Sequence, residues 1–222
     1  MSARHIDIIT ISREFGAGGS SVAKALSAKL GWPVLDDDLP QRVADRLQVD
    51  RELVERLDEQ PTTLIGRIAR VLLTSQAESP AVVPYVDVAD EETIADAARA
   101  VVEEAGRTPP LIVVGHGGQA IFRGRSDTFH VRLVAPIESR VRRICSRLPC
   151  DAPTAEARVR RADVERREYL RRNFGVEWRD ELLYDLQINT GQISIDTAAG
   201  LVLQAMEPQA VGGSRQSAVG SR

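Results

Sequence analysis

Residues 6–26, IDIITISREFGAGGSSVAKAL, place a β-branched run, a glycine-rich turn and a helical repeat directly after one another. Ile6 to Ile11 is typical of a buried strand, and apolar residues recur from 22 to 30 at the spacing of a helix. In such a turn, unpaired backbone N–H groups and the helix dipole point at the loop. The segment therefore predicts an anion-binding loop, with a purely structural strand-to-helix turn as the alternative.

The turn matches part of the phosphate-binding pattern G-x-x-x-x-G-K-[ST]. Arg13 stands at the first glycine and Gly19 at the lysine, in the string Arg13-Glu14-Phe15-Gly16-Ala17-Gly18-Gly19-Ser20. Small residues let phosphate oxygens approach the backbone. The contacts expected for a bound phosphate group are the backbone amides of Gly16, Ala17, Gly18 and Gly19 and the hydroxyls of Ser20 and Ser21.

The rest of the chain alternates short strands with helices. Strands are expected at 32–35, 111–114, 128–135 and 184–188, and helices at 154–173, at 193–206 and from Pro136 onward. Residues 39–107 are mostly helical in pattern, in pieces separated by Asp50, Pro61 and the apolar stretch 80–88. This order predicts a single α/β domain with a parallel sheet covered by helices on both faces.

The composition is that of a globular protein with a small negative charge. Hydrophobic residues make up 43% of the chain, charged residues 27%, and the formal net charge is -3. This balance gives no general attraction to nucleic acid or to a membrane, so neither is expected as a partner. No run approaches the ~18 apolar residues of a membrane span. Cys145 and Cys150 are interpreted as ordinary thiols, and we expect a cytoplasmic protein.

Three blocks of sequence resemble the cytidylate kinase-like family. The first runs from Ile9 through the glycine-rich loop to Leu35-Asp36, and its Ser-Arg-Glu start and doubled glycine are similar to that family. The second includes Val113-Val114-Gly115-His116-Gly117 and His130 to Arg140. The third is Tyr184-Asp185-Leu186-Gln187-Ile188-Asn189-Thr190.

The resemblance implies the fold of P-loop nucleoside monophosphate kinases. It implies a five-stranded parallel sheet flanked by helices, with a core of residues 6–36 and 111–206 in one domain, 1–206. A helical acceptor-binding insertion is expected at about 39–107 and an arginine-rich lid at about 150–175. Residues 207–222 are rich in Gly, Ser and Gln and are expected to be a disordered tail.

The resemblance also implies transfer of the γ-phosphoryl group of ATP, with Mg²⁺, to a small nucleotide such as CMP. Ser20 is the expected hydroxyl ligand of the metal, and Arg140 and Arg143 match an arginine pair near the donor nucleotide. All but two of the 29 lysine and arginine residues are arginine. Arg13 could therefore supply the charge that the lysine position lacks. A brace between Arg13 and an acid, and helix capping by the serines, are the alternatives.

Acceptor binding is assigned to residues that follow the second and third strands. Asp36 and Arg42 match an Asp and an Arg of cytidylate kinases, although Asp37 and Asp38 replace a Thr-Gly pair there. His116 occupies a place where relatives commonly carry arginine. The simpler interpretations are a helix start capped by acids and a histidine that bonds the backbone.

The lid is expected to contribute Arg166 and Arg172 to catalysis. Asp163-x-x-Arg166 matches the spacing of the family's lid, and a closed lid would exclude water from the transferring group. The alternative for each arginine is an i, i+4 ion pair on a solvated helix.

Two function classes follow from these residues. The leading one is a small-molecule kinase, either of a nucleoside monophosphate or of a non-nucleotide metabolite. The second is a nucleotide-binding regulatory protein that keeps the loop but transfers little, because Gly19 replaces the lysine. A homodimer is possible under either, and ATP turnover that depends on an acceptor separates the two.

Overall fold

The computed structural model describes residues 5–36, 38–47 and 91–207 of the chain. Most of the expected insertion, including Asp50, Pro61 and the stretch 80–88, lies outside these residues, as does almost all of the expected tail. The helices of the insertion that are described are α2 and α4, at Leu39–Leu47 and Glu91–Ala105.

A five-stranded parallel sheet forms the centre of the molecule. Its strand order is β2-β3-β1-β4-β5, so that β1 lies in the middle and pairs with β3 and β4. The strands are β1 Ile8–Arg13, β2 Val34–Leu35, β3 Leu111–Val114, β4 Thr128–Val134 and β5 Leu186–Asn189. All five expected strands are present. Strand β3 has the expected bounds, β4 ends one residue earlier than expected, and β1, β2 and β5 each begin two residues later.

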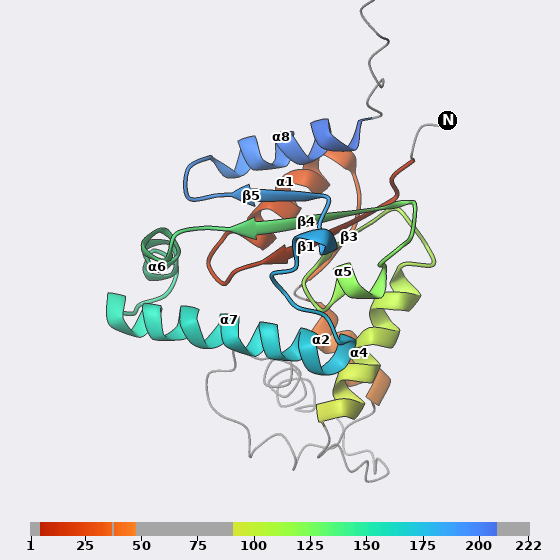
Figure 1. Ribbon diagram of the computed structural model, residues 1–222, viewed down its shortest axis with the longest axis horizontal. Helices are drawn as coiled ribbons and strands as arrows, with labels where there is room; N and C mark the ends of the chain where they lie inside the picture. The colour runs from red at the N-terminus through yellow and green to blue at the C-terminus, as the bar shows by residue number, and fades with distance from the viewer. Residues whose placement is uncertain (1–4, 37, 48–90, 208–222) are drawn as a thin grey trace, which may run out of the picture.

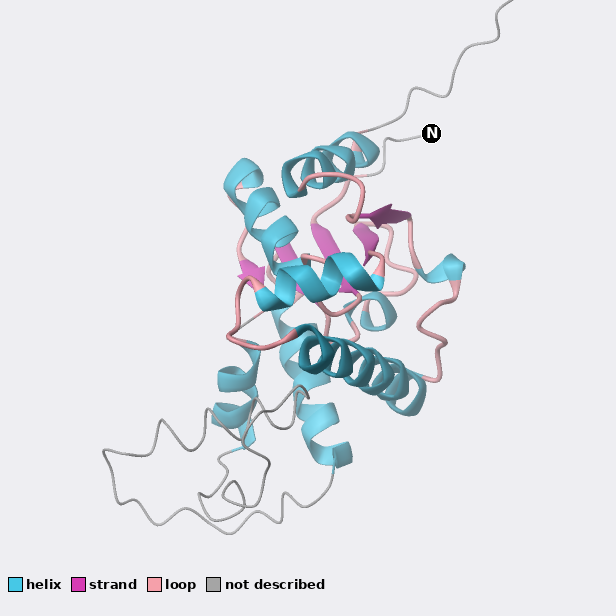
Figure 2. Cartoon of the chain, turned by 90° about the vertical axis from the view of Figure 1, so that its left-hand side faces the viewer, coloured by secondary structure: helices cyan, strands magenta, loops and turns pink. Residues whose placement is uncertain are grey.

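Helices cover both faces of the sheet, as Figures 1 and 2 show. Helices α1, Gly19–Leu30, and α8, Ile195–Met206, pack against each other over one face. Their core includes Ile9, Ile11, Val22, Leu26, Val131, Leu133 and Val202. The opposite face carries α4, α2 and the short α5, Gly118–Ile121, with Ile8, Val113 and Phe122 in the core. The expected fold class, a five-stranded parallel sheet flanked by helices, is confirmed.

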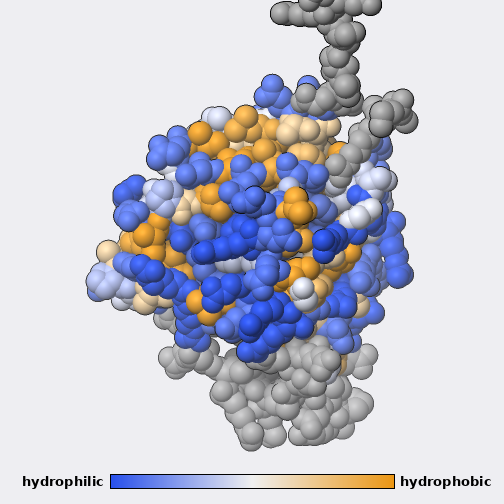
Figure 3. Space-filling view, in the orientation of Figure 1, coloured by the Kyte–Doolittle hydropathy of each residue, from blue (hydrophilic) through white to orange (hydrophobic). Residues whose placement is uncertain are grey.

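Two helices cross the edge of the sheet where β1 and β4 end. Helix α6, Ile137–Cys145, leads into α7, Ala152–Phe174, which is the longest helix described and coincides with the expected lid. Asp151 caps α7 by accepting from the backbone N–H of Thr154 at 2.9 Å. Figure 3 shows hydrophilic residues across the middle and lower part of this face, and hydrophobic residues gathered toward its upper part. Exposed i, i+4 pairs such as Arg160–Glu156 contribute to that surface.

Two short elements were not expected from the sequence. Helix α5 has four residues and the 3-10 helix η3, Glu181–Leu183, has three, which is too short for a periodic apolar pattern. Both lie on the face of the sheet opposite α1. None of the helices in the described part of the chain combines the length and apolar character needed to cross a bilayer.

Candidate active site

The glycine-rich loop connects the central strand β1 to the start of α1. Gly16 and Gly18 have φ of 82° and 89°, a region that favours glycine, and Gly18 is the N-cap of α1. No side chain caps this helix start, so its first backbone N–H groups point into the loop. A Cβ at Gly16 would lie 3.0 Å from the Cβ of Arg140. The loop is therefore a tightly packed turn at the start of a helix, in which the N–H of Ala17 already donates to the carbonyl of Glu14 at 3.0 Å. Phosphate binding by its backbone N–H groups stays a prediction.

Arg13 crosses the position that the lysine of the usual pattern would occupy. A Cβ built on Gly19 would lie 2.7 Å from the Cγ of Arg13, so the arginine stem fills this space. The guanidinium group continues to Gly115, where a Cβ would collide with Nη1. Its Nη2 lies 3.9 Å from Oδ1 of Asp36. Gly19 is thus a glycine because Arg13 passes over it, and a positive charge stands between the loop and the end of β2.

Asp36 is buried at the end of β2, with 6% of its surface exposed, and it faces Arg13. The structure therefore brings together the residue expected to supply charge to the phosphoryl group and the residue expected to orient the acceptor. The same contact is the brace that was the alternative for Arg13. A carboxylate beside a guanidinium can hold it in place while its other N–H groups remain available to an anion.

Arg42 and His116 lie in different surroundings. Arg42 donates from Nε to Oδ2 of Asp38 at 2.8 Å, an exposed i, i+4 contact. This is the helix-start pairing that was the alternative to acceptor binding. His116 has φ of 55° in the turn after β3, and Phe174 of the lid packs where Gly117 has no side chain. Acceptor binding by Arg42 and by His116 stays a prediction.

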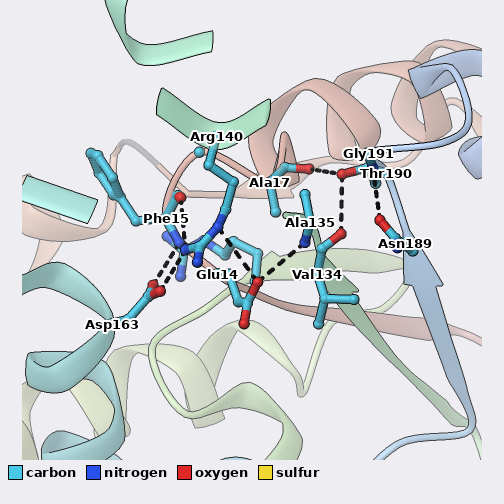
Figure 4. A network of polar contacts seen from close by, with 12 residues as sticks. Glu14, Phe15, Ala17, Val134, Ala135, Arg140, Asp163, Asn189, Thr190 and Gly191 are labelled. Atoms are coloured by element: carbon cyan, nitrogen blue, oxygen red, sulfur yellow. Dashed lines mark hydrogen bonds and ion pairs between the residues drawn. The ribbon is translucent and has the colours of Figure 1, made fainter. Parts of the chain in front are cut away.

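The start of the loop is attached to both α6 and α7 through Arg140 (Figure 4). Arg140 is buried, donates from Nη1 to Asp163 at 2.5 Å and lies 3.6 Å from Glu14. Asp163 accepts from the backbone N–H of Phe15 at 2.8 Å. Glu14 accepts from the backbone N–H of Ala135 at 3.1 Å. We call Glu14, Arg140 and Asp163 the latch, because they hold the loop against α7.

Arg143 holds the middle of the loop. It donates to the carbonyl of Gly16 at 3.3 Å and to the hydroxyl of Thr190 at 3.1 Å, and Thr190 donates to the carbonyl of Ala17 at 2.7 Å. Burial lowers the pKa of Arg143, and the positive charges of Arg147 and Arg142 act in the same direction. In the described residues, none of these three arginines lies within 4 Å of a carboxylate. A region of uncompensated positive charge therefore borders the loop.

Ser21 and Ser20 begin α1, where a phosphate and its metal would meet the helix. Ser21 accepts from Nη2 of Arg147 at 3.0 Å. Both serines are partly buried. Arg147 was one arginine among many in the sequence, and the roles of Glu14 and Arg147 were missed. Their partners are 121 and 126 residues away along the chain, so no local pattern could reveal them.

The two arginines of α7 that were expected to take part in catalysis lie in different surroundings. Arg166 donates to the backbone carbonyl of Arg13 at 2.9 Å, and its guanidinium lies 5.3 Å from the centre of the Phe15 ring. Arg172 lies 3.6 Å from Glu168 in an exposed i, i+4 pair. Arg166 therefore touches the loop, whereas Arg172 shows the surface contact that was its alternative. Catalytic roles for both stay predictions.

The model of the cytidylate kinase-like family matches residues 8–192. The chain belongs to this family. A protein named cytidylate kinase from Sulfolobus acidocaldarius is 26% identical to this member over 199 residues, which cover 88% of the chain and 91% of the relative.

Solved structures share the fold of this cytidylate kinase-like chain at low identity. A protein from Eubacterium ventriosum has a TM-score of 0.63 and 20% identity, covering 91% of this chain and 99% of its own. Shikimate kinase from Acinetobacter baumannii, in complex with shikimate, has a TM-score of 0.50 and 16% identity, with coverages of 90% and 93%. A gluconokinase from Sinorhizobium meliloti has a TM-score of 0.52 and 15% identity, with coverages of 91% and 93%. These likenesses show the fold alone.

Proposed function

We propose that this chain is an ATP-dependent kinase that phosphorylates a small acceptor, with CMP as the first candidate. The observation that carries the proposal is the position of Arg13. Its side chain fills the space over Gly19 and places a guanidinium group between the loop and Asp36. A kinase of this fold needs a positive charge there, and the chain supplies it from the other end of the loop.

ATP and Mg²⁺ fit the residues that are present. The start of α1 has no side-chain cap, and the small residues Gly16, Gly18 and Gly19 let phosphate oxygens approach the backbone N–H groups there. The N–H of Ala17 donates instead to the carbonyl of Glu14. Ser20 offers a hydroxyl to the metal, which in such sites takes its other ligands from phosphates and water. When bound, ATP supplies the γ-phosphoryl group, which passes to an acceptor oxygen as its bond to ADP breaks, and magnesium neutralises charge.

The side chains of the chain then position the acceptor and exclude water. Arg13 donates N–H groups toward the end of β2, and Asp36 offers carboxylate oxygens to an acceptor hydroxyl. The latch and Arg166 keep α7 against the loop, so that water has limited access. The chain thus contributes alignment and charge, which is most of what phosphoryl transfer requires from a protein.

The first test is an acceptor panel. Purified protein would be incubated with ATP and Mg²⁺ against CMP, dCMP, UMP, shikimate and gluconate, and ADP release would be followed. We expect ADP formation that depends on one class of acceptor and falls at least about 100-fold in Arg13→Ala. Arg107→Ala, which removes an exposed arginine, is the matched control and should keep full activity.

The alternative is a nucleotide-binding regulatory protein, and the absence of a lysine at Gly19 is the observation that favours it. Tight ATP binding without ADP release for any acceptor would support this alternative and contradict the kinase. The homodimer and the cytoplasmic location expected from the sequence remain predictions.

A further inference from the structure

One face of the two central strands carries a row of buried polar side chains that ends at the loop. Thr10 and Ser12 of β1 and His130 and Arg132 of β4 are all at most 9% exposed. The hydroxyl of Thr10 and Nδ1 of His130 are 2.7 Å apart, and Ser12 pairs in register with Arg132. Because Ser12 immediately precedes Arg13, this row leads from the sheet centre to the candidate active site.

Arg132 lies between two aromatic rings. Its guanidinium carbon is 5.5 Å from the ring centre of Trp178 and 5.5 Å from that of Tyr184. Trp178 donates from Nε1 to the hydroxyl of Ser12 at 2.9 Å, and Tyr184 donates from its hydroxyl to the carbonyl of Trp178 at 2.8 Å. These bonds hold both rings in place, so the guanidinium lies between two anchored rings beside Ser12, the residue before Arg13.

Arg132 has no hydrogen-bond acceptor within the described part of the chain. Only 5% of the residue is exposed, and its Nε is buried without a partner. No described carboxylate lies within 4 Å of it, whereas the other buried arginine, Arg140, has both Glu14 and Asp163. Aromatic rings attract the cation but accept none of its five N–H groups as a carboxylate would.

A buried charge without a counter-ion is costly, so the fold keeps Arg132 at the expense of stability. The planar fork of an arginine matches the two oxygens of a carboxylate or a phosphate. The missing partner is therefore an anion with at least two oxygens on one centre. Its place is next to Ser12, which immediately precedes Arg13, on the face of the sheet opposite α1. Under the proposed function, this is where an acceptor held by Arg13 and Asp36 would reach it.

We propose that Arg132, held between Trp178 and Tyr184, binds an acidic group of the acceptor, either a phosphate or a carboxylate. This inference rests on the proposed kinase function, because only a kinase has an acceptor. Binding of an acidic molecule to Arg132 can be measured without turnover. Arg132 selects acidic acceptors over neutral ones of the same shape. His116 and Arg42 are not needed for this selection.

The test uses Trp178 as a reporter of binding. In a full-length Trp32→Phe background, Trp178 is the remaining tryptophan, and its fluorescence is followed with the loop saturated by Mg²⁺ and a non-hydrolysable ATP analogue. CMP is compared with cytidine, and glycerate with glycerol, which separates phosphate from carboxylate. We expect one acidic probe to bind at least about tenfold more tightly than its neutral counterpart, and this preference to disappear in Arg132→Met.

Arg132→Lys keeps the charge without the fork, so part of the preference should return; this variant also serves if Arg132→Met does not fold. Equal binding of acidic and neutral probes, or an unchanged preference in Arg132→Met, would overturn the proposal. A more stable Arg132→Met with unchanged binding would likewise show that the arginine has a packing role. If an acidic probe binds through Arg132 but no ADP is released, the inference about Arg132 holds and the kinase function is contradicted. If the protein turns over ATP and Arg132→Met leaves this turnover unchanged, the kinase function holds and the inference about Arg132 is contradicted.

Discussion

At the scale of the residue, Arg13 and Gly19 act as one unit. The stem of Arg13 lies where any side chain at position 19 would begin, at 2.7 Å from a built Cβ. Real Cβ atoms do not approach this closely, so a side chain at 19 must displace the arginine. The position of the Arg13 charge therefore depends on the absence of a side chain at Gly19.

A double-mutant cycle tests this dependence. Gly19→Lys alone should lower activity, because the new side chain pushes Arg13 away from Asp36 and crowds the loop, with a loss of about 1–3 kcal/mol in stability. Arg13→Gly together with Gly19→Lys recreates the usual pattern and should recover much of that loss. ADP release and urea unfolding of the four proteins would show a coupling of at least about 1 kcal/mol. Additive effects would contradict the shared space.

At the scale of the element, α7 is joined to the loop by the latch and not merely placed near it. Arg140 is buried and its closest acid is Asp163, on α7. The same carboxylate accepts from the backbone of Phe15, so it links the helix to the loop directly. A change in the position of α7 should therefore alter the loop, and a change in the loop should alter the position of α7.

Asp163→Asn should destabilise the protein by about 2 kcal/mol, because Arg140 keeps its burial and loses its nearest charge. The amide can still accept from Phe15, so the change isolates the ion pair. Glu156→Gln, which breaks the exposed pair with Arg160 on the same helix, is the matched control and should cost no more than about 0.5 kcal/mol. Urea unfolding measures both. Equal effects of the two substitutions would contradict a structural latch.

The elements of this fold were largely predictable from the sequence, and the contacts of the site were not. Leu111–Val114 forms the expected strand because four apolar residues between breakers have few other ways to be buried. The loop was predicted from its glycines, because the backbone conformation of a tight turn depends on the residues of the turn itself. The pairing of Arg13 with Asp36, and of Arg140 with Asp163, depends on how distant segments meet. Local patterns offer each arginine several acids and do not choose among them.

At the scale of the whole molecule, stability should decline at alkaline pH in a way that one tyrosine reveals. Burial raises the pKa of Tyr169 to about 12, and its hydroxyl is buried without a hydrogen-bond partner among the described residues. The folded state then holds this proton while the unfolded chain loses it near pH 10. The contribution of Tyr169 to the free energy of unfolding is therefore fully present below about pH 10, and it is lost as the pH rises toward about 12.

Tyr169→Phe removes this titrating group, so the free energy of unfolding should fall less steeply between about pH 10 and 12 than in the unchanged protein. The variant should also be more stable near pH 7 by up to about 1 kcal/mol, because no unsatisfied hydroxyl is buried. Thermal or urea unfolding at a series of pH values measures both. Burial also raises the pKa of Tyr184, so some alkaline loss will remain in the variant. A variant with an unchanged pH profile would show that Tyr169 does not titrate as expected.

The shared space of Arg13 and Gly19 also constrains the history of such loops. A chain with glycine at 13 and lysine at 19 cannot drift into this one by single neutral steps. Losing the lysine first removes the charge, and gaining the arginine first brings two long side chains into one volume. Proteins that carry only one of the two changes are therefore expected to be less active than proteins with either loop type. Ancestral lineages should contain the two positions as inherited pairs, with mixed combinations rare or short-lived.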